Sequence, residues 1–171
     1  DHPRILLTSD TIREVRVRIA ADSEIARIYA HYIHHFKRRA GADYTRAGKN
    51  CWTVGHNMTS LGIAWNLSGD VFFLDAAKEQ LARLESPWAR NLGHFDNPQL
   101  LGGAATCLDL VWNGLDRPEQ VRFAKALLVI ADKQQKAWRF SDVSNQIYTN
   151  SGKNILIGLA LAGANVDPAK E

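Results

Sequence analysis

Apolar side chains return every three or four residues along most of the chain, which is the spacing of one face of an α-helix. No long stretch shows the strict alternation of apolar and polar residues that indicates a β-strand. The sequence therefore predicts an all-α fold. The helical pattern is clearest over residues 12–19, 25–36, 54–65, 73–84, 101–111, 121–131 and 155–162.

Residues that begin and end helices recur along the chain. Thr8 is placed to cap the first helix, and residues 116–119 (DRPE) combine a cap, an early proline and a glutamate three residues after the aspartate. Gly69, Gly114 and Gly163 are predicted to end helices in the left-handed conformation that glycine adopts readily. They are 45 and 49 residues apart, which indicates a weak repeat of helix–turn–helix units.

The first helix of each later pair is richer in small apolar residues than the second. Residues 102–105 (GGAA) and 158–163 (GLALAG) suit helices that are crowded on every side, whereas residues 78–83 and 125–133 keep a solvated face. Inner helices surrounded by outer ones predict helical hairpins that form part of an (α/α) toroid. We interpret residues 1–171 as a single all-α domain. The outer partner of the last inner helix is missing, so we expect an incomplete, N-terminal portion that is truncated at the C-terminus.

Positive charge is concentrated at the start of the chain. The net charge is +3, of which residues 1–50 carry +4 and the remainder −1. His31, His34 and His35 share one side of a helix, but no HExxH pattern or nearby carboxylate completes a metal site, so a solvated basic face is favoured. No nucleic-acid-reading motif accompanies the charge, and we predict no nucleic-acid partner. A modest positive field would suit an acidic polymer.

The number of cysteines argues against a disulfide-rich protein, and the hydropathy pattern argues against a membrane-spanning one. Two cysteines cannot form a disulfide framework, and Cys51 and Cys107 both fall within apolar helical patterns, which favours buried free thiols. No apolar run approaches the roughly 20 residues of a membrane helix, so no membrane partner is predicted. The first residues carry no signal peptide, as in a mature protein from which a leader has been removed.

Several segments together resemble the catalytic toroid of the heparinase II/III-like and alginate lyase-like polysaccharide lyases. The opening HPRILLT is the most specific of them, whereas the others would fit many (α/α) toroids. The resemblance covers essentially the whole chain. The segments that carry it are residues 2–8, 12–15, 18–22, 64–77, 93–95, 108–112 and 116–120.

The resemblance implies a cleft that binds an acidic polysaccharide, and a β-sandwich domain that follows the toroid. The reaction in such lyases is β-elimination at a uronic acid: an Asn, His, Gln or Glu side chain neutralises the sugar carboxylate, and a Tyr or His removes the C5 proton. Residues 144–148 (SNQIY) are similar to the neutralising segment, which gives Asn145 and Gln146 catalytic roles. The usual catalytic tyrosine would lie beyond Glu171, so the chain alone is expected to be inactive.

Further candidates lie near the starts of the inner helices, which should converge on the cleft. Aromatic rings suit the apolar faces of sugars, and imidazole can bind a carboxylate or act as an acid or base near neutral pH. The alternatives are that Asn145 and Gln146 cap a helix, and that the histidines and aromatic residues are satisfied within the core. The predicted substrate-binding residues are His94, His56, Trp52, Tyr148, Asn97 and Gln99.

The sequence is thus interpreted as the N-terminal part of a polysaccharide lyase that acts on a uronate-containing polymer without a cofactor or metal ion. Its expected location is periplasmic or secreted, and its expected partners are the polysaccharide and the remainder of the toroid with its β-sandwich. One alternative is a glycoside hydrolase on the same toroid, with Asp96 and Asp142 as the two carboxylates. The other is a non-catalytic α-helical repeat that binds a protein or glycan.

Overall fold

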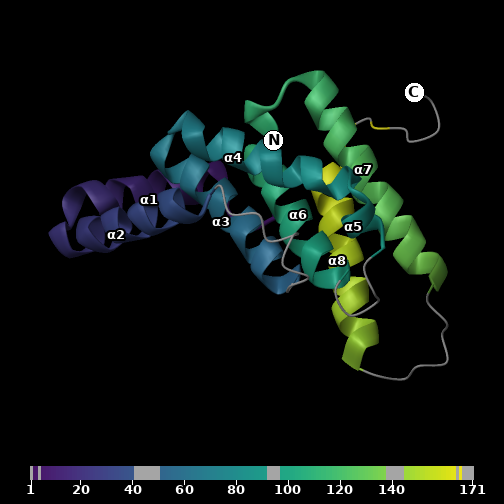
Figure 1. Cartoon of the computed structure of the whole chain (residues 1–171). Coiled ribbons are helices and arrows are strands. Elements are labelled where there is room, and N and C mark those ends of the chain that lie inside the picture. The colour runs from purple at the N-terminus through teal and green to yellow at the C-terminus, as the bar shows by residue number, and fades with distance from the viewer. Residues whose placement is uncertain are drawn as a thin grey trace.

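The computed structural model describes residues 2–3, 5–40, 51–91, 97–137, 145–164 and 166, and nearly all of them belong to helices (Figure 1). No strand occurs in these ranges, so the prediction of an all-α fold is confirmed. The α-helices are α1 (Ser9–Ala21), α2 (Ser23–Arg39), α3 (Cys51–Ser68), α4 (Val71–Ala82), α5 (Pro87–Arg90), α6 (Asn97–Val111), α7 (Arg117–Ala137) and α8 (Asn145–Leu161), with 3-10 turns η1 (Arg83–Glu85) and η2 (Trp112–Gly114).

Helices α3, α6 and α8 form one layer of parallel helices. Gly55 of α3 lies against Gly103 of α6, and Gly62 further along α3 lies against Leu110 further along α6, so the two helices run in the same direction. On the other side of α6, Gly102 contacts the side chain of Lys153 in α8. Helices α4 and α7 pack on this layer as the second members of their hairpins (Figure 1). Closure of such hairpins into a toroid stays a prediction.

Local capping residues begin several of these helices, as their sequence predicts. The Thr8 hydroxyl accepts a bond from the amide of Thr11 at 3.2 Å and caps α1. At the start of α7, Glu119 N–H donates to Asp116 Oδ1 at 2.8 Å, and Asp116 N–H donates to Glu119 Oε2 at 3.1 Å. This reciprocal pair is a capping box, which satisfies two amide groups that a helix start would leave without partners.

The three predicted glycine stops differ in their backbone conformation. Gly69 and Gly163 end α3 and α8 with φ of 70° and 72°, the left-handed conformation that the sequence predicts. Gly114 instead lies in the 3-10 turn η2, and it is not among the glycines with positive φ. A Cβ atom there would lie 2.9 Å from Leu74 Cδ2, so close packing against α4 accounts for this glycine.

The hydrophobic core is built around α3 and α6. Large side chains from these helices and from α4 and α7 are fully buried in it, among them Met58, Phe73 and Phe123. Cys51 and Cys107 are buried free thiols, as predicted, and burial raises the pKa of Cys107 to about 12. Trp112 is also buried in this core. Glu85 of η1 pairs with Arg122 of α7, and this ion pair lowers the pKa of the Glu85 carboxyl.

Helices α1 and α2 form a hairpin that projects from one side of the helical body (Figure 1). Among its residues only Ile12 of α1 is buried, and α2 has no buried residue at all. The contacts that attach α2 come from half-buried Tyr32, Ile33 and Phe36. The Tyr32 hydroxyl donates to the carbonyl of Ser60 in α3 at 3.2 Å, and Lys37 pairs with Asp70 at 2.7 Å.

Within the described ranges, no helix combines the length and the hydropathy that crossing a membrane would require.

Candidate functional site

A groove of about 230 Å³ lies between α3, α6 and α8. It runs along the N-terminal halves of α3 and α6 and the middle of α8. Because the three helices are parallel, their first turns lie toward the same end of the layer. The lining residues are Gly55, His56, Thr59, Ser60, Gln99, Gly102, Gly103, Thr106, Lys153 and Leu156.

Glycines form part of the groove wall and decide how closely its helices approach. A Cβ atom on Gly103 would lie 2.3 Å from Cα of Gly55, and one on Gly55 would lie 2.4 Å from the carbonyl oxygen of Gln99. Real Cβ atoms do not approach other atoms so closely, so only glycine permits this contact between two helix backbones. The glycines that the sequence shows in these helices therefore shape the groove.

The polar groups that line the groove are basic or neutral. His56 is exposed, Gln99 is half-buried, and the stem of Lys153 lies across Gly102. The hydroxyls of Thr59 and Thr106 donate to carbonyls of their own helices at 3.1 and 2.9 Å. None of the described residues that line the groove is acidic. These described residues can donate hydrogen bonds to an anion, and no carboxylate among them would repel it.

The groove brings together two of the predicted substrate-binding residues, His56 and Gln99. Sequence reasoning does not single out Thr59 or Thr106, although a signal exists: Thr59 follows His56 by three residues, and Thr106 follows Gly102 by four. These spacings place each threonine on the same helix face as its neighbour in the groove. Lys153 is not among the predicted site residues either, although its side chain contacts Gly102 of α6 and lines the groove.

The other predicted site residues lie at the edge of the described structure or outside it. Trp52, Asn97 and the pair Asn145–Gln146 belong to the first turns of α3, α6 and α8, and Tyr148 follows in α8. Their backbones are therefore at the end of the layer toward which the groove runs, but their side chains lie outside the described structure. His94 and the alternative pair Asp96 and Asp142 also lie outside the described residues.

A larger cavity, of about 530 Å³, lies at the other end of the layer between α1 and the C-terminal ends of α3 and α6. It contains none of the predicted site residues. Two of its polar residues serve the packing of the chain: Arg16 donates to the carbonyls of Asn66 and Leu67, and His2 pairs with the fully buried Asp109. We interpret this cavity as the junction at which the first residues and α1 meet the helical layer.

The chain has no match among family models or curated proteins. Nowhere in the described part of the chain do three or more His, Cys, Asp or Glu side chains gather so that they could hold a metal ion.

Proposed function

We propose that this chain is the N-terminal helical part of a polysaccharide lyase-like protein, and that the groove between α3, α6 and α8 binds a uronate-containing polysaccharide. The observation that carries the proposal is the composition of the groove. His56, Gln99 and Lys153 come from three different helices and converge on one cavity whose described lining includes no acidic residue. An extended sugar acid needs donors of this kind along its length.

The chemistry of β-elimination explains why such donors would matter. Removing the C5 proton of a uronate places negative charge beside an existing carboxylate, which is costly unless preorganised donors meet the developing charge. In this proposal the amides of Asn145 and Gln146, in the first turn of α8, neutralise the carboxylate. His94, Trp52, Tyr148 and Asn97 extend the sugar-binding surface, and no cofactor takes part. The natural setting would be the periplasm or the outside of the cell, where such polymers occur.

A glycoside hydrolase is the weaker alternative for the same groove. Hydrolysis of a glycosidic bond generally uses two carboxyl groups on either side of the bond. The described lining of the groove supplies neither of them. The two candidates for these carboxyl groups, Asp96 and Asp142, lie outside the described residues, so the preference for an anionic ligand rests on the His56, Gln99 and Lys153 side chains of the groove.

Binding of a labelled polygalacturonate oligosaccharide tests the groove directly. We expect Lys153→Gln to weaken binding roughly tenfold, because it removes one charge-assisted hydrogen bond to a carboxylate. We expect His56→Gln to weaken binding of the oligosaccharide as well. Lys136→Gln is the matched control, since Lys136 is an exposed α7 lysine paired with Asp132 and does not line the groove. Wild-type affinity in both groove variants would contradict the proposal, provided that circular dichroism shows them folded.

The reaction is tested by incubating the full-length protein with uronate polymers and following the absorbance of the unsaturated product. Elimination creates that double bond, whereas hydrolysis creates only new reducing ends. We expect Asn145→Ala to lose most of the activity. Full activity in this variant would remove Asn145 from the mechanism, and reducing ends without absorbance would favour the hydrolase.

A further inference from the structure

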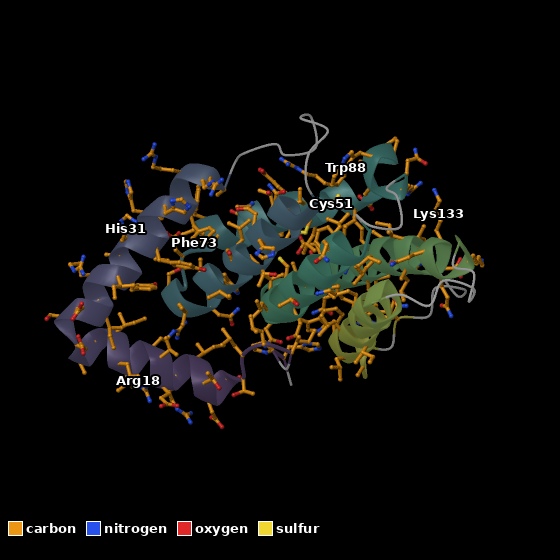
Figure 2. The ribbon with its side chains drawn as sticks, turned by 90° about the horizontal axis from the view of Figure 1, so that it is seen from below. Arg18, His31, Cys51, Phe73, Trp88 and Lys133 are labelled. Carbon is orange, nitrogen blue, oxygen red and sulfur yellow. The ribbon has the colours of Figure 1, made fainter. Side chains whose placement is uncertain are left out.

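A basic surface follows the outward side of α2, away from the groove. It consists of Arg27, His31, His34, His35, Arg38 and Arg39, which we call the α2 stripe. Arg27, His31, His34 and Arg38 are separated by four, three and four residues, so they share one helix face. They extend over about 16 Å of helix at the usual rise per residue. Figure 2 shows His31 on α2 at one edge of the hairpin and Arg18 on α1 at the opposite edge.

The charge of the α2 stripe is poorly compensated by acidic groups. Glu24 is the one acidic residue within α2, and its carboxylate is 3.9 Å from Arg27. The only other partner found for the stripe among the described residues is internal, between Arg39 and His35 at 3.3 Å. Several exposed cations elsewhere are held closely by acids, as in Arg13–Asp10, Arg18–Glu14 and Lys136–Asp132, whereas Arg16 and Lys133 donate to backbone carbonyls. The three arginines of the stripe, with three protonatable histidines along the same helix, therefore carry positive charge that the described acids do little to offset, which points to a binding role for an anion.

The rest of the α2 surface favours a sugar polymer over other polyanions. Proteins that bind single-stranded nucleic acid stack bases on exposed aromatic side chains. On α2, Tyr32 and Phe36 pack against the core and Tyr29 is half-buried, so no aromatic side chain of this helix is fully exposed. Helices that lie in a membrane surface bury a broad apolar face in lipid. On α2, Tyr32, Ile33 and Phe36 already pack against the core, which leaves only a narrow exposed apolar area. Ile25 and Ile28 remain exposed beside the stripe and suit the small apolar faces of sugar rings.

We propose that the α2 stripe is a docking surface for an acidic polysaccharide chain, separate from the groove. An extended polymer fits better than a compact anion, because the basic side chains lie along an exposed helix and neither of the two described cavities includes any of them. The inference goes beyond the proposed function: it concerns a second surface and requires no catalysis. A surface of this kind would hold the polymer near the protein while the groove engages a single segment of it.

Histidine makes the charge of this surface depend on pH, because an imidazole ring can accept a proton as the solution is acidified. The charged groups of α2 itself are Glu24, Arg27, Lys37, Arg38 and Arg39, and Lys37 is paired with Asp70 at 2.7 Å. The neighbouring α1 carries Asp10, Arg13, Glu14, Arg16 and Arg18, and α3 contains no Asp, Glu, Lys or Arg. No hydrogen bond or ion pair joins these α1 groups to the histidines in the described structure. Acidification should therefore add positive charge to the stripe and strengthen binding of a polyanion.

The experiment measures binding of a fluorescent heparin oligosaccharide at about pH 7.5 and pH 5.5 at constant ionic strength. We expect roughly tenfold tighter binding at the lower pH, since each cation that meets the polymer adds to affinity. The triple variant His31→Gln, His34→Gln, His35→Gln should lose this gain and keep the affinity at pH 7.5. The double variant Arg27→Gln, Arg38→Gln should bind more weakly at both pH values.

Control variants distinguish the contribution of the stripe to binding from the effect of total charge and from the contribution of the groove. Arg13→Gln with Arg18→Gln removes the same charge from α1 and should weaken binding far less than the α2 double variant does. Lys153→Gln acts on the groove alone and should leave the pH gain intact, so failure of one proposal is distinguishable from failure of the other. A pH gain that survives in the triple histidine variant would overturn the inference. Equal losses from the α1 and α2 double variants would also overturn it, as would stripe-dependent binding of single-stranded RNA or anionic phosphatidylserine vesicles in place of heparin.

Discussion

Asp109 is a buried carboxylate that fixes the first residues of the chain onto the end of α6. One of its oxygens lies 2.7 Å from Nδ1 of His2, and the other accepts the amide of Ile5 at 2.9 Å. The His2 ring also stacks on Trp112 with centroids 4.9 Å apart, and the side-chain amide of Asn113 donates to the His2 carbonyl at 2.7 Å. The Asp109 carboxylate, the His2 ring and the Asn113 amide thus hold one another in place at the end of α6.

We expect Asp109→Ala to lower the free energy of unfolding by about 3 kcal/mol, because it leaves a buried imidazole and a backbone amide without their acceptor. Urea unfolding measures this loss. The matched control is Asp10→Ala, which removes an exposed carboxylate paired with Arg13 and should change stability by less than about 0.5 kcal/mol. Similar small effects for both variants would show that Asp109 does not anchor the N-terminal segment.

At the residue scale, the sequence reveals partners that are close along the chain and misses those that are distant. The Asp116–Glu119 capping box is visible because three residues separate its members. His2 and Asp109 are 107 residues apart, and no local pattern connects them. The sequence predicts His56 and Gln99 because each lies near the start of an inner helix, whereas Thr59 and Thr106 require knowledge of which helix face meets the groove.

The contact between α3 and α6 depends on glycine at the point where their backbones meet. We expect Gly103→Ala to lower the free energy of unfolding by about 3 kcal/mol, because the new methyl group would overlap Gly55 and the helices would have to separate. The same substitution should reduce ligand binding in the groove, whose wall both glycines form.

Gly158→Ala in α8 is the control for that substitution. Gly158 is exposed, and a methyl group added there would have no atom of a neighbouring element within 4 Å, so alanine should stabilise the helix by about 0.5 to 1 kcal/mol. Thermal or urea unfolding compares the two variants. Equal effects of either sign would show that intrinsic helix propensity, and not the close approach at Gly55, governs the glycines of this layer.

At the element scale, hydropathy locates the long helices well and the short connecting ones poorly. The predicted segments all fall within or overlap long helices, because burial of one face imposes its period on the sequence. The four-residue α5 and the turns η1 and η2 are too short to show a period, and the sequence predicts none of them. The side-by-side order of α3, α6 and α8 depends on contacts between residues that are distant in the sequence. The spacing of the glycines that end the helices indicates that the hairpins repeat, but it does not show which helices touch.

At the scale of the whole molecule, burial divides the described chain into a tightly packed layer and a loosely attached hairpin. Nearly every residue on the inner faces of α3 and α6 is buried, whereas α2 contributes none. Helix α8 is intermediate: it packs on α6 but leaves Ile155 62% and Leu159 47% exposed.

Native-state hydrogen exchange should report the same division. Helices with few buried contacts open at a lower free-energy cost than the core, so amides of α2 should exchange well before those of α3 and α6. Tyr32→Phe removes the hydrogen bond to the Ser60 carbonyl and should speed exchange in α2 further, while α6 keeps its protection. Protection of α2 equal to that of α6, or loss of protection in both helices on Tyr32→Phe, would mean that the hairpin and the layer unfold as one cooperative unit. In that case α2, together with the α2 stripe that it carries, would unfold only when the whole layer unfolds, and not by a separate local opening.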